Sequence, residues 1–127
     1  MRILHTPGGI APPFSRYSHG VEAKNVSRWL SVSGQVGVAS DGNLAEGAAA
    51  QMEQAWRNIF EVLASAQMAP ENLVKITAFL TSREDLSTFR EVRDRLLGAA
   101  QPASSLVVVA GLADPAWLVE IEALAAA

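Results

Sequence analysis

The pattern of hydrophobic and polar positions predicts short strands interrupted by two helices. Near the C-terminus, residues 105–110 are apolar and rich in β-branched side chains after Ser105, which is typical of a strand covered on both faces. Residues 119–124 alternate instead, with Glu120 and Glu122 on the polar face of the predicted strand. A turn at residues 114–115 separates the two strands.

The two carboxylates of the last strand admit two interpretations. Beside the small hydroxyls of Ser104 and Ser105, they line a polar pocket at the edge of a sheet. Alternatively, Glu120 and Glu122 are the solvated face of an edge strand. The alternation itself is compatible with both interpretations.

The N-terminal part of the chain predicts three further strands. Residues 2–5, 17–23 and 29–36 have the appropriate patterns, and a Pro- and Gly-rich loop lies between the first two. Within the third strand, Gly34 predicts a bulge or a point where another group approaches the backbone closely. Asp41-Gly42-Asn43 predicts a turn after that strand.

Two amphipathic segments predict helices. The first runs from about Gly47 to Ala66. Its apolar stripe consists of Met52, Ala55, Trp56, Ile59, Val62, Leu63 and Ala66, and the opposite side carries Gln51, Gln54, Arg57, Asn58 and Glu61. The second helix is predicted to start at Ser82-Arg83-Glu84-Asp85 and to end at Gly98. It turns Leu86, Phe89, Val92 and Leu96 inward.

Between the helices, residues 73–80 predict a buried strand. The resulting order of elements indicates an α+β fold in which two helices cover one face of a mixed sheet of about six strands. Several strands carry apolar residues toward both faces, and no further element remains for the second face. We therefore expect the sheet to pack against copies of itself, because a large apolar patch would otherwise face water.

Composition narrows the class of protein. The 127 residues predict one domain, and 50% hydrophobic with 18% charged residues indicates a compact globular chain. There is no cysteine, which excludes thiol chemistry and disulfides and fits a cytoplasmic protein. No apolar run approaches the roughly 20 residues of a membrane span, and no secretory signal is predicted. The net charge of −3 argues against nucleic acid as a ligand.

An ordered set of short motifs resembles the RidA/YjgF family of reactive-intermediate (imine/enamine) deaminases. The matching pieces are Tyr-Ser-His-Gly-Val at 17–21, Ser-Gly-Gln-Val at 33–36, residues 51–59, residues 74–80, Pro-Ala at 102–103, Val-Ala-Gly-Leu at 109–112 and Glu-Ile-Glu-Ala at 120–123. Each motif is weak by itself, but their unbroken order covers nearly the whole chain.

The resemblance implies a chorismate-mutase-like subunit that forms a homotrimer with ligand clefts between subunits. It implies that Glu120 positions the water that attacks an imine carbon, and that Tyr17, Ser33, Gly34 and Phe89 line the same cleft. A small organic ligand is the implied partner. Because imine hydrolysis needs only a positioned water and a proton relay, neither a metal nor a cofactor is expected.

The chain departs from the family at the group that binds the substrate carboxylate. The family has an arginine after Pro-Ala, where this chain has Ser104, which supplies a neutral hydrogen bond and no charge. Arg93 stands where the family has an asparagine. With Arg83, Arg90 and Arg95 it alternates with acidic residues, a pattern that is also typical of a solvated helix face.

Three hypotheses follow from the missing arginine. In the first, Arg93 or Arg16 projects into the cleft and replaces it, so that hydrolysis of an anionic imine is preserved. In the second, the cleft takes a neutral or less anionic substrate, and Glu120 still holds a water. In the third, the protein binds a small metabolite without turnover and acts as a sensor or an interaction module.

Overall fold

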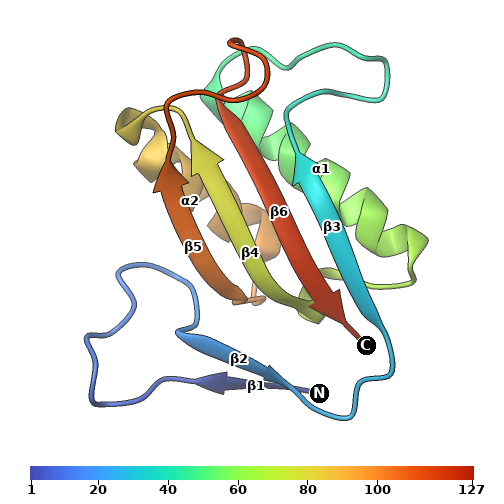
Figure 1. Ribbon diagram of the computed structural model, residues 1–127, viewed down its shortest axis with the longest axis vertical. Helices are drawn as coiled ribbons and strands as arrows, with labels where there is room; N and C mark the ends of the chain where they lie inside the picture. Colours follow the sequence, from blue (N-terminus) through green and yellow to red (C-terminus); the bar gives the residue numbers. More distant parts are fainter.

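The computed structural model describes residues 1–127 and contains six strands and two α-helices in the predicted order (Figure 1). The elements are β1 (Arg2–His5), β2 (Gly20–Ala23), β3 (Trp29–Gln35), α1 (Ala48–Ser65), β4 (Leu73–Leu80), α2 (Leu86–Leu97), β5 (Ala103–Val108) and β6 (Val119–Ala126). Single 3₁₀ turns at Pro70–Asn72 and Arg83–Asp85 precede β4 and α2. The predicted α+β class is confirmed.

The strands form a four-stranded sheet and a separate two-stranded ribbon. The order in the sheet is β3-β6-β4-β5, in which β4 and β5 are parallel and the other pairs are antiparallel. Helix α2 makes the crossover between the two parallel strands. Strands β1 and β2 pair with each other, and a single parallel bridge between Ser18 and Ala103 joins the segment before β2 to the free edge of β5.

Two predictions about the C-terminal strands are wrong. Strand β6 is central, paired with both β3 and β4, so its carboxylates do not lie on an edge strand. Strand β5 occupies the edge and is not covered on both faces, and Val107 and Val108 are each 43% exposed. The apolar run at 105–110 reflects an edge strand whose second side is uncovered within one subunit.

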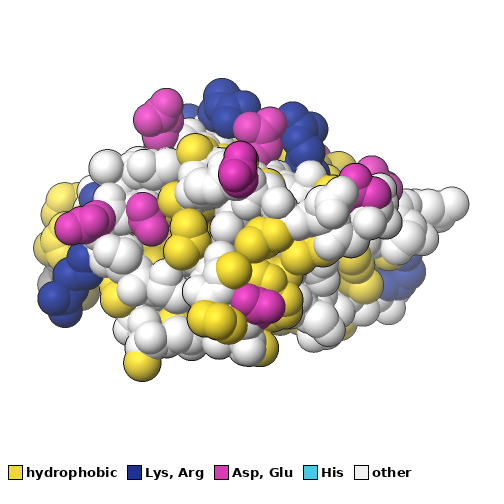
Figure 2. Space-filling model, turned by 90° about the horizontal axis from the view of Figure 1, so that it is seen from above, with side chains coloured by type: hydrophobic (Ala, Val, Ile, Leu, Met, Phe, Trp, Pro, Cys, Tyr) yellow, Lys and Arg dark blue, Asp and Glu magenta, His cyan; other side chains and the backbone are white.

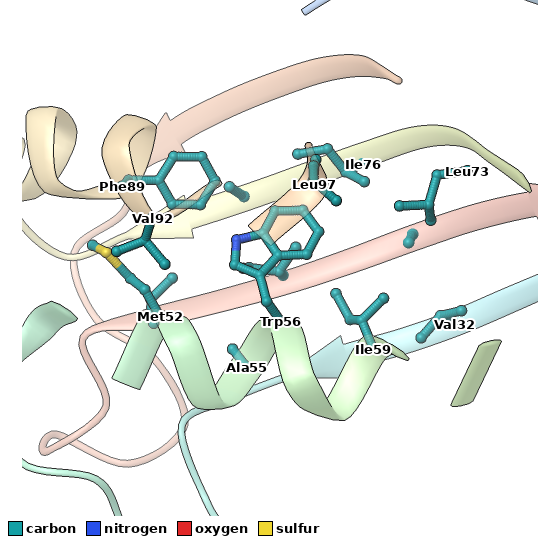
Figure 3. Close-up of a cluster of buried hydrophobic side chains, with 14 of the residues drawn as sticks. Val32, Met52, Ala55, Trp56, Ile59, Leu73, Ile76, Phe89, Val92 and Leu97 are labelled. Atoms are coloured by element: carbon teal, nitrogen blue, oxygen red, sulfur yellow. The ribbon is translucent and has the colours of Figure 1, made fainter. Parts of the chain in front are cut away.

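Both helices lie on one face of the four-stranded sheet, and the core fills the space between them (Figures 1 and 3). Trp56 of α1 and Phe89 of α2 are fully buried, with ring centroids 6.4 Å apart. The residues that the two central strands contribute to this core are Leu73, Ile76, Ala78 and Leu80 of β4 and Val119, Ile121, Ala123 and Ala125 of β6. The alternation in β4 holds from Ile76 onward, because the ladder with β6 shifts register between Leu73 and Lys75. In β6 and in this part of β4, the period-two pattern therefore predicted the core face correctly.

Gln51 lies in the protein interior, although the helical pattern placed it on the polar side of α1. It is 3% exposed. Its Oε1 accepts a hydrogen bond from the Leu118 amide (2.9 Å), and its Nε2 donates to the Ala116 carbonyl (3.2 Å). These two bonds attach the loop before β6 to the first turns of α1. The burial of Gln51 is thus explained by backbone groups that need a polar partner.

The helix-free face of the sheet is more polar than the sequence pattern predicted. Ser31 and Ser33 of β3, Lys75 and Thr77 of β4 and Glu122 of β6 alternate with core residues and point to this face. This polar surface is interrupted by three apolar side chains, those of Phe79, Val107 and Leu124. The expectation of a continuous apolar patch is therefore wrong, and the case for subunit contacts rests on the site described below.

Helix α2 begins and ends at the predicted signals. The Ser82 side chain accepts a hydrogen bond from the Glu84 amide at the preceding 3₁₀ turn, and Gly98 terminates the helix with φ = 59°. The segment predicted as a strand over 17–23 is regular only from Gly20 onward. Residues 17–19 instead form part of a loop that runs beside β5.

Candidate functional site between α2 and the edge of the sheet

A pocket of about 290 Å³ lies between α2, β5 and the loop before β2. It is lined by Phe14, Ser15, Tyr17, Leu86, Phe89, Arg90, Arg93, Ser104 and Leu106. Four of the predicted substrate-binding residues, Tyr17, Phe89, Arg93 and Ser104, therefore lie around one space. Ligand pockets commonly measure roughly 300–1,000 Å³, so this one suits a small metabolite.

Regular elements hold two walls of this pocket. Phe89 and Arg93 are four residues apart on α2 and so share one face of the helix. Ser104 pairs in register with Ile76, whose side chain is fully buried beneath the helices, so Ser104 points to the helix side of β5. The edge position of β5 leaves this wall open toward solvent.

Hydrogen bonds shape the loop that forms the third wall. The Tyr17 hydroxyl accepts a hydrogen bond from the Phe14 amide (3.4 Å), and the Ser18 hydroxyl donates to the Gln101 carbonyl (2.6 Å). The His19 ring meets the Tyr17 ring edge-on at 6.1 Å, while its Nε2 lies 2.7 Å from the Ala11 carbonyl. His19 thus takes part in holding the loop, and Phe14 is left 81% exposed at the pocket mouth.

Arg93 is buried, which contradicts its interpretation as part of a solvated helix face. The residue is 4% exposed. Its Nε donates a hydrogen bond to Asp94 Oδ1 at 3.0 Å. Its Nη2 lies 3.0 Å from the same oxygen but makes no hydrogen bond, and it is shielded from solvent. The guanidinium carbon lies 6.0 Å from the centre of the Phe89 ring.

Glu120, Ser33 and Gly34 form a second group on the helix-free face. A Cβ atom built at Gly34 would lie 2.7 Å from Glu120 Cδ and 2.9 Å from Cγ, well inside van der Waals contact. The ladder between β3 and β6 shifts register between Val32 and Gln35, which confirms the bulge predicted at Gly34. The glycine and the bulge together give the Glu120 side chain its place against β3.

The two groups lie on opposite faces of the same sheet. Glu120 pairs with Phe79 on the helix-free side, and Ser104 pairs with Ile76 on the helix side. Within one subunit the pocket and the carboxylate therefore cannot act on the same small molecule. The structure brings the predicted residues together as two half-sites.

The predicted cluster of serine hydroxyls beside the carboxylates is also divided. Ser105 faces the helix-free side, where its hydroxyl accepts a hydrogen bond from Lys75 Nζ (2.7 Å). In register it is followed by Thr77 on β4 and Glu122 on β6. Ser104 points the other way. Ser105 and Glu122 thus share a polar row, whereas Ser104 belongs to the pocket.

Sequence reasoning missed several residues that line the pocket. Leu86 and Arg90 lie on the same helix face as Phe89 and Arg93, so the helical spacing carried a signal for them. Phe14 and Ser15 come from a loop without periodicity, and nothing in the pattern placed them beside α2.

The chain also has no helix both long and apolar enough to span a lipid bilayer.

The surface seen from the end of the sheet carries both signs of charge. Lys and Arg side chains lie next to Asp and Glu along one margin, and hydrophobic side chains reach the surface in the middle (Figure 2). The ion pairs Arg57–Glu53 and Arg95–Glu53 are examples of this alternation on the helix side. On this face, therefore, the basic side chains do not form a separate positive patch.

The fold and the divided site define an α+β subunit whose polar residues form two half-sites, and comparisons with known proteins show the family to which it belongs. The family model described as Endoribonuclease L-PSP matches residues 9–127. The human 2-iminobutanoate/2-iminopropanoate deaminase is 35% identical over 98% of this chain and 88% of its own length. A RutC family protein of Aquifex aeolicus is 36% identical over 74% of this chain and 70% of its own.

Solved structures give the same result. The crystal structure of YyfB from Yersinia pestis, a protein of unknown function of the Rid family, superposes with a TM-score of 0.88 at 32% identity, covering 99% of this chain and 98% of that one. The chain belongs to the RidA/YjgF family, as its motifs indicated.

Proposed function

We propose that this protein hydrolyses a small imine or enamine at a cleft formed between subunits, with Glu120 as the residue that positions water. The reaction class is supported by the similarity to relatives named 2-iminobutanoate/2-iminopropanoate deaminase. The observation that carries the proposal is the fit between Gly34 and the Glu120 carboxyl group. No basic side chain pairs with this carboxylate, so it is free to accept a proton from water.

The reaction requires mainly that the protein hold a water molecule in position beside the imine carbon. The carboxylate of Glu120 accepts a proton as the water oxygen bonds to the imine carbon, and the electron pair of the C=N bond moves to nitrogen. Nitrogen takes up protons, the carbinolamine expels ammonia, and a carbonyl compound is left. An enamine enters the same sequence after it tautomerises to the imine. Water is the only co-reactant, and holding it in line with the carbon supplies the rate enhancement.

The division of the site supports a cleft shared by two subunits. The pocket between α2 and β5 opens at the free edge of the sheet, and Glu120 stands on the helix-free face. If the edge of one subunit docks on the helix-free face of the next, the two half-sites meet. This contact is heterologous, and heterologous contacts form a closed ring when the rotation between subunits closes; the ring that we propose is a homotrimer.

Turnover of freshly generated imines tests the reaction. A 2-imino acid is produced by an amino-acid oxidase in the presence of semicarbazide, and the protein competes with the trapping reaction. Compared with the reaction without protein, we expect the wild type to lower the yield of semicarbazone. Glu120→Gln should give the same yield as the reaction without protein. Glu122→Gln is the matched control, because Glu122 lies on the same strand face and the atoms nearest to a Cβ at residue 34 all belong to Glu120.

Two outcomes would contradict the proposal. Wild-type protein that leaves the semicarbazone yield unchanged across 2-imino acids and neutral imines would point to binding without turnover. Turnover that survives in Glu120→Gln would remove this residue from the mechanism. Ribonuclease activity, which the family model's description names, is not part of the proposal because the chain has a net charge of −3.

A further inference from the structure

The guanidinium of Arg93 has more donors than partners. Arginine carries five N–H donors, yet only Nε of Arg93 makes a hydrogen bond, to the neighbouring Asp94. Nη2 is enclosed and unbonded although the carboxylate oxygen is 3.0 Å away, because the geometry is poor. Among the buried side-chain atoms, only this nitrogen and Trp56 Nε1 lack a partner.

Burying such a group without partners is unfavourable. An unsatisfied buried donor costs roughly 1–3 kcal/mol, and more when the group is charged. The carboxylate of Asp94 offsets part of this cost. However, the Asp94 side chain is 36% exposed and lies on one side of the guanidinium only. The remaining N–H groups would gain most from an anion that enters the pocket Arg93 lines.

The lining of that pocket suits an anion with an apolar body. Arg90 and Arg93 contribute two positive charges, and no Asp or Glu lines the space. The remaining wall is mainly apolar, formed by Phe14, Tyr17, Leu86, Phe89 and Leu106. Ser104 adds one hydroxyl, and its shortness leaves free the space that a long side chain at this position of β5 would fill.

We infer that Arg93, on α2, binds the carboxylate of the substrate in the role that the sequence resemblance assigns to an arginine at the position of Ser104. The substrate is then a small 2-imino or 2-enamino acid with an apolar side chain. Its carboxylate meets Arg93, its side chain contacts Phe89 and Leu106, and its reactive carbon faces the neighbouring subunit. The reaction assigned to this substrate rests on the proposed function, whereas the binding of the carboxylate does not.

Binding of an unreactive acid separates the two claims. The probe is 2-oxobutanoate, which has the carboxylate but no imine, and the neutral comparison is 2-oxobutanamide; both are titrated by NMR on the full-length protein. We expect Arg93→Gln to weaken binding of 2-oxobutanoate roughly ten- to a hundredfold and to change binding of the amide little. Arg93→Lys retains part of the affinity. Arg95→Gln is the matched control, since Arg95 lies on the same helix but pairs with Glu53 outside the pocket.

A rescue distinguishes an anchor from a structural residue. Arg93→Gln combined with Ser104→Arg returns a guanidinium to the same pocket from β5, and we expect the double variant to regain affinity for 2-oxobutanoate. If Arg93→Gln does not fold, the ¹⁵N signals of the Arg93 side chain in the wild type replace it as the readout. These signals shift on addition of 2-oxobutanoate and not of the amide if Arg93 binds the carboxylate.

The outcomes also separate this inference from the proposed function. Equal loss of acid and amide binding in Arg93→Gln, or undiminished acid binding, would overturn the assignment of Arg93. Imine turnover that is independent of Arg93 would leave the proposed hydrolysis standing and remove the anchor. Binding of 2-oxobutanoate that depends on Arg93, without turnover of any imine, would keep the anchor and remove the hydrolysis.

Discussion

The Glu120 side chain occupies the space that a Cβ atom at residue 34 would need. Three atoms of the Glu120 side chain lie within van der Waals overlap of that position, and the glycine sits at a bulge of β3. The bulge and the missing side chain thus act together on one carboxylate. We infer that Gly34 is required for the position of Glu120 and not for the fold of β3.

Gly34→Ala tests this relationship. The added methyl group must push the carboxylate away, and displacement of a reacting group by about 1 Å can cost on the order of a hundredfold in rate. We therefore expect kcat of imine hydrolysis to fall at least about tenfold, with little change in the melting temperature because residue 34 is exposed. Gly111→Ala, which meets no atom within 4 Å, serves as the control. Full activity in Gly34→Ala would show that the carboxylate position is not limiting.

Mixed oligomers test whether the site is shared between subunits. Glu120→Gln and Arg93→Gln subunits carrying different tags are co-expressed and the hybrids purified through both tags. In a mixed trimer of either ratio, about a third of the clefts combine an intact Arg93 of one subunit with an intact Glu120 of its neighbour. We expect the hybrids to recover activity that neither parent has. Hybrids as inactive as their parents would contradict the shared cleft.

The sequence predicted which segments form helices and strands, but it did not predict which strands pair with one another. Strict alternation in residues 76–80 and 119–124 identified the core faces, and the helical stripe around Trp56 identified the side of α1 that contacts the sheet. Periodicity reports which face of an element is buried. It does not report which strand lies beside which, so the central position of β6 and the edge position of β5 were missed.

The same limit applies to the site. The resemblance implied one cleft lined by Tyr17, Ser33, Gly34 and Phe89, with Arg93 or Arg16 as a possible replacement for the missing arginine. Tyr17, Phe89, Arg93 and Ser104 do line one pocket, whereas Gly34 lies beside Glu120 instead. The alternation over residues 119–124 put Glu120 on the face opposite the core, but the motifs carry no information on which face of its strand each residue occupies. The separation of the pocket from Glu120 by the thickness of the sheet was therefore missed. The burial of Arg93 was missed because its acidic neighbours in sequence look like solvated partners, whereas only Asp94 contacts it.

Trp56 offers a test of the core. Its indole is fully buried, 6.2 Å from the Phe60 ring and 6.4 Å from the Phe89 ring, and its Nε1 has no hydrogen-bond partner. Trp56→Ala should lower the free energy of unfolding by about 3–5 kcal/mol. Trp56→Phe should cost only about 1–2 kcal/mol, since it also removes the unpaired donor. Urea unfolding at one protein concentration measures both, and a loss in Trp56→Phe well above about 2 kcal/mol would mean that the indole N–H is satisfied.

The lowered pKa of the Glu53 carboxyl predicts how the stability of the fold depends on pH. Hydrogen bonds from Arg57 (2.8 Å) and Arg95 (3.1 Å) hold the pKa of the Glu53 carboxyl below its ordinary value of 4.5, and Arg95 joins α2 to α1 through it. A lowered folded-state pKa means that the stabilisation is complete above pH 4.5 and is lost as the pH falls through the folded-state value.

The matching experiment compares melting temperatures from pH 7 to pH 2.5. Glu53→Gln should melt slightly below the wild type at pH 7, and the difference should shrink to nothing in acid. Exposed pairs contribute little, so we expect a shift of a few degrees at most. Glu61→Gln, on the same helix and without a bonded partner, should show no such convergence. A gap between wild type and Glu53→Gln that is constant across the range would contradict the assignment.

Gln51 connects the stability of the fold to the position of Glu120. Its side chain bonds the Leu118 amide and the Ala116 carbonyl, and β6 starts at Val119, one residue before the carboxylate. Gln51→Leu keeps the volume but leaves both backbone groups without a partner, which should cost about 2 kcal/mol of unfolding free energy. Because the start of β6 loses its attachment, we expect kcat to fall more than KM rises.

Two comparisons make that result specific. Gln51→Glu retains an acceptor for the Leu118 amide and should lie between the wild type and Gln51→Leu in both measurements. Gln54→Leu removes only a bond to Asn58 within α1 and should leave kcat unchanged. A Gln51→Leu variant that is destabilised but turns over imines at the wild-type rate would show that the 114–118 loop does not position Glu120. The loop would then be a purely structural connection, and the bulge at Gly34 alone would fix the carboxylate.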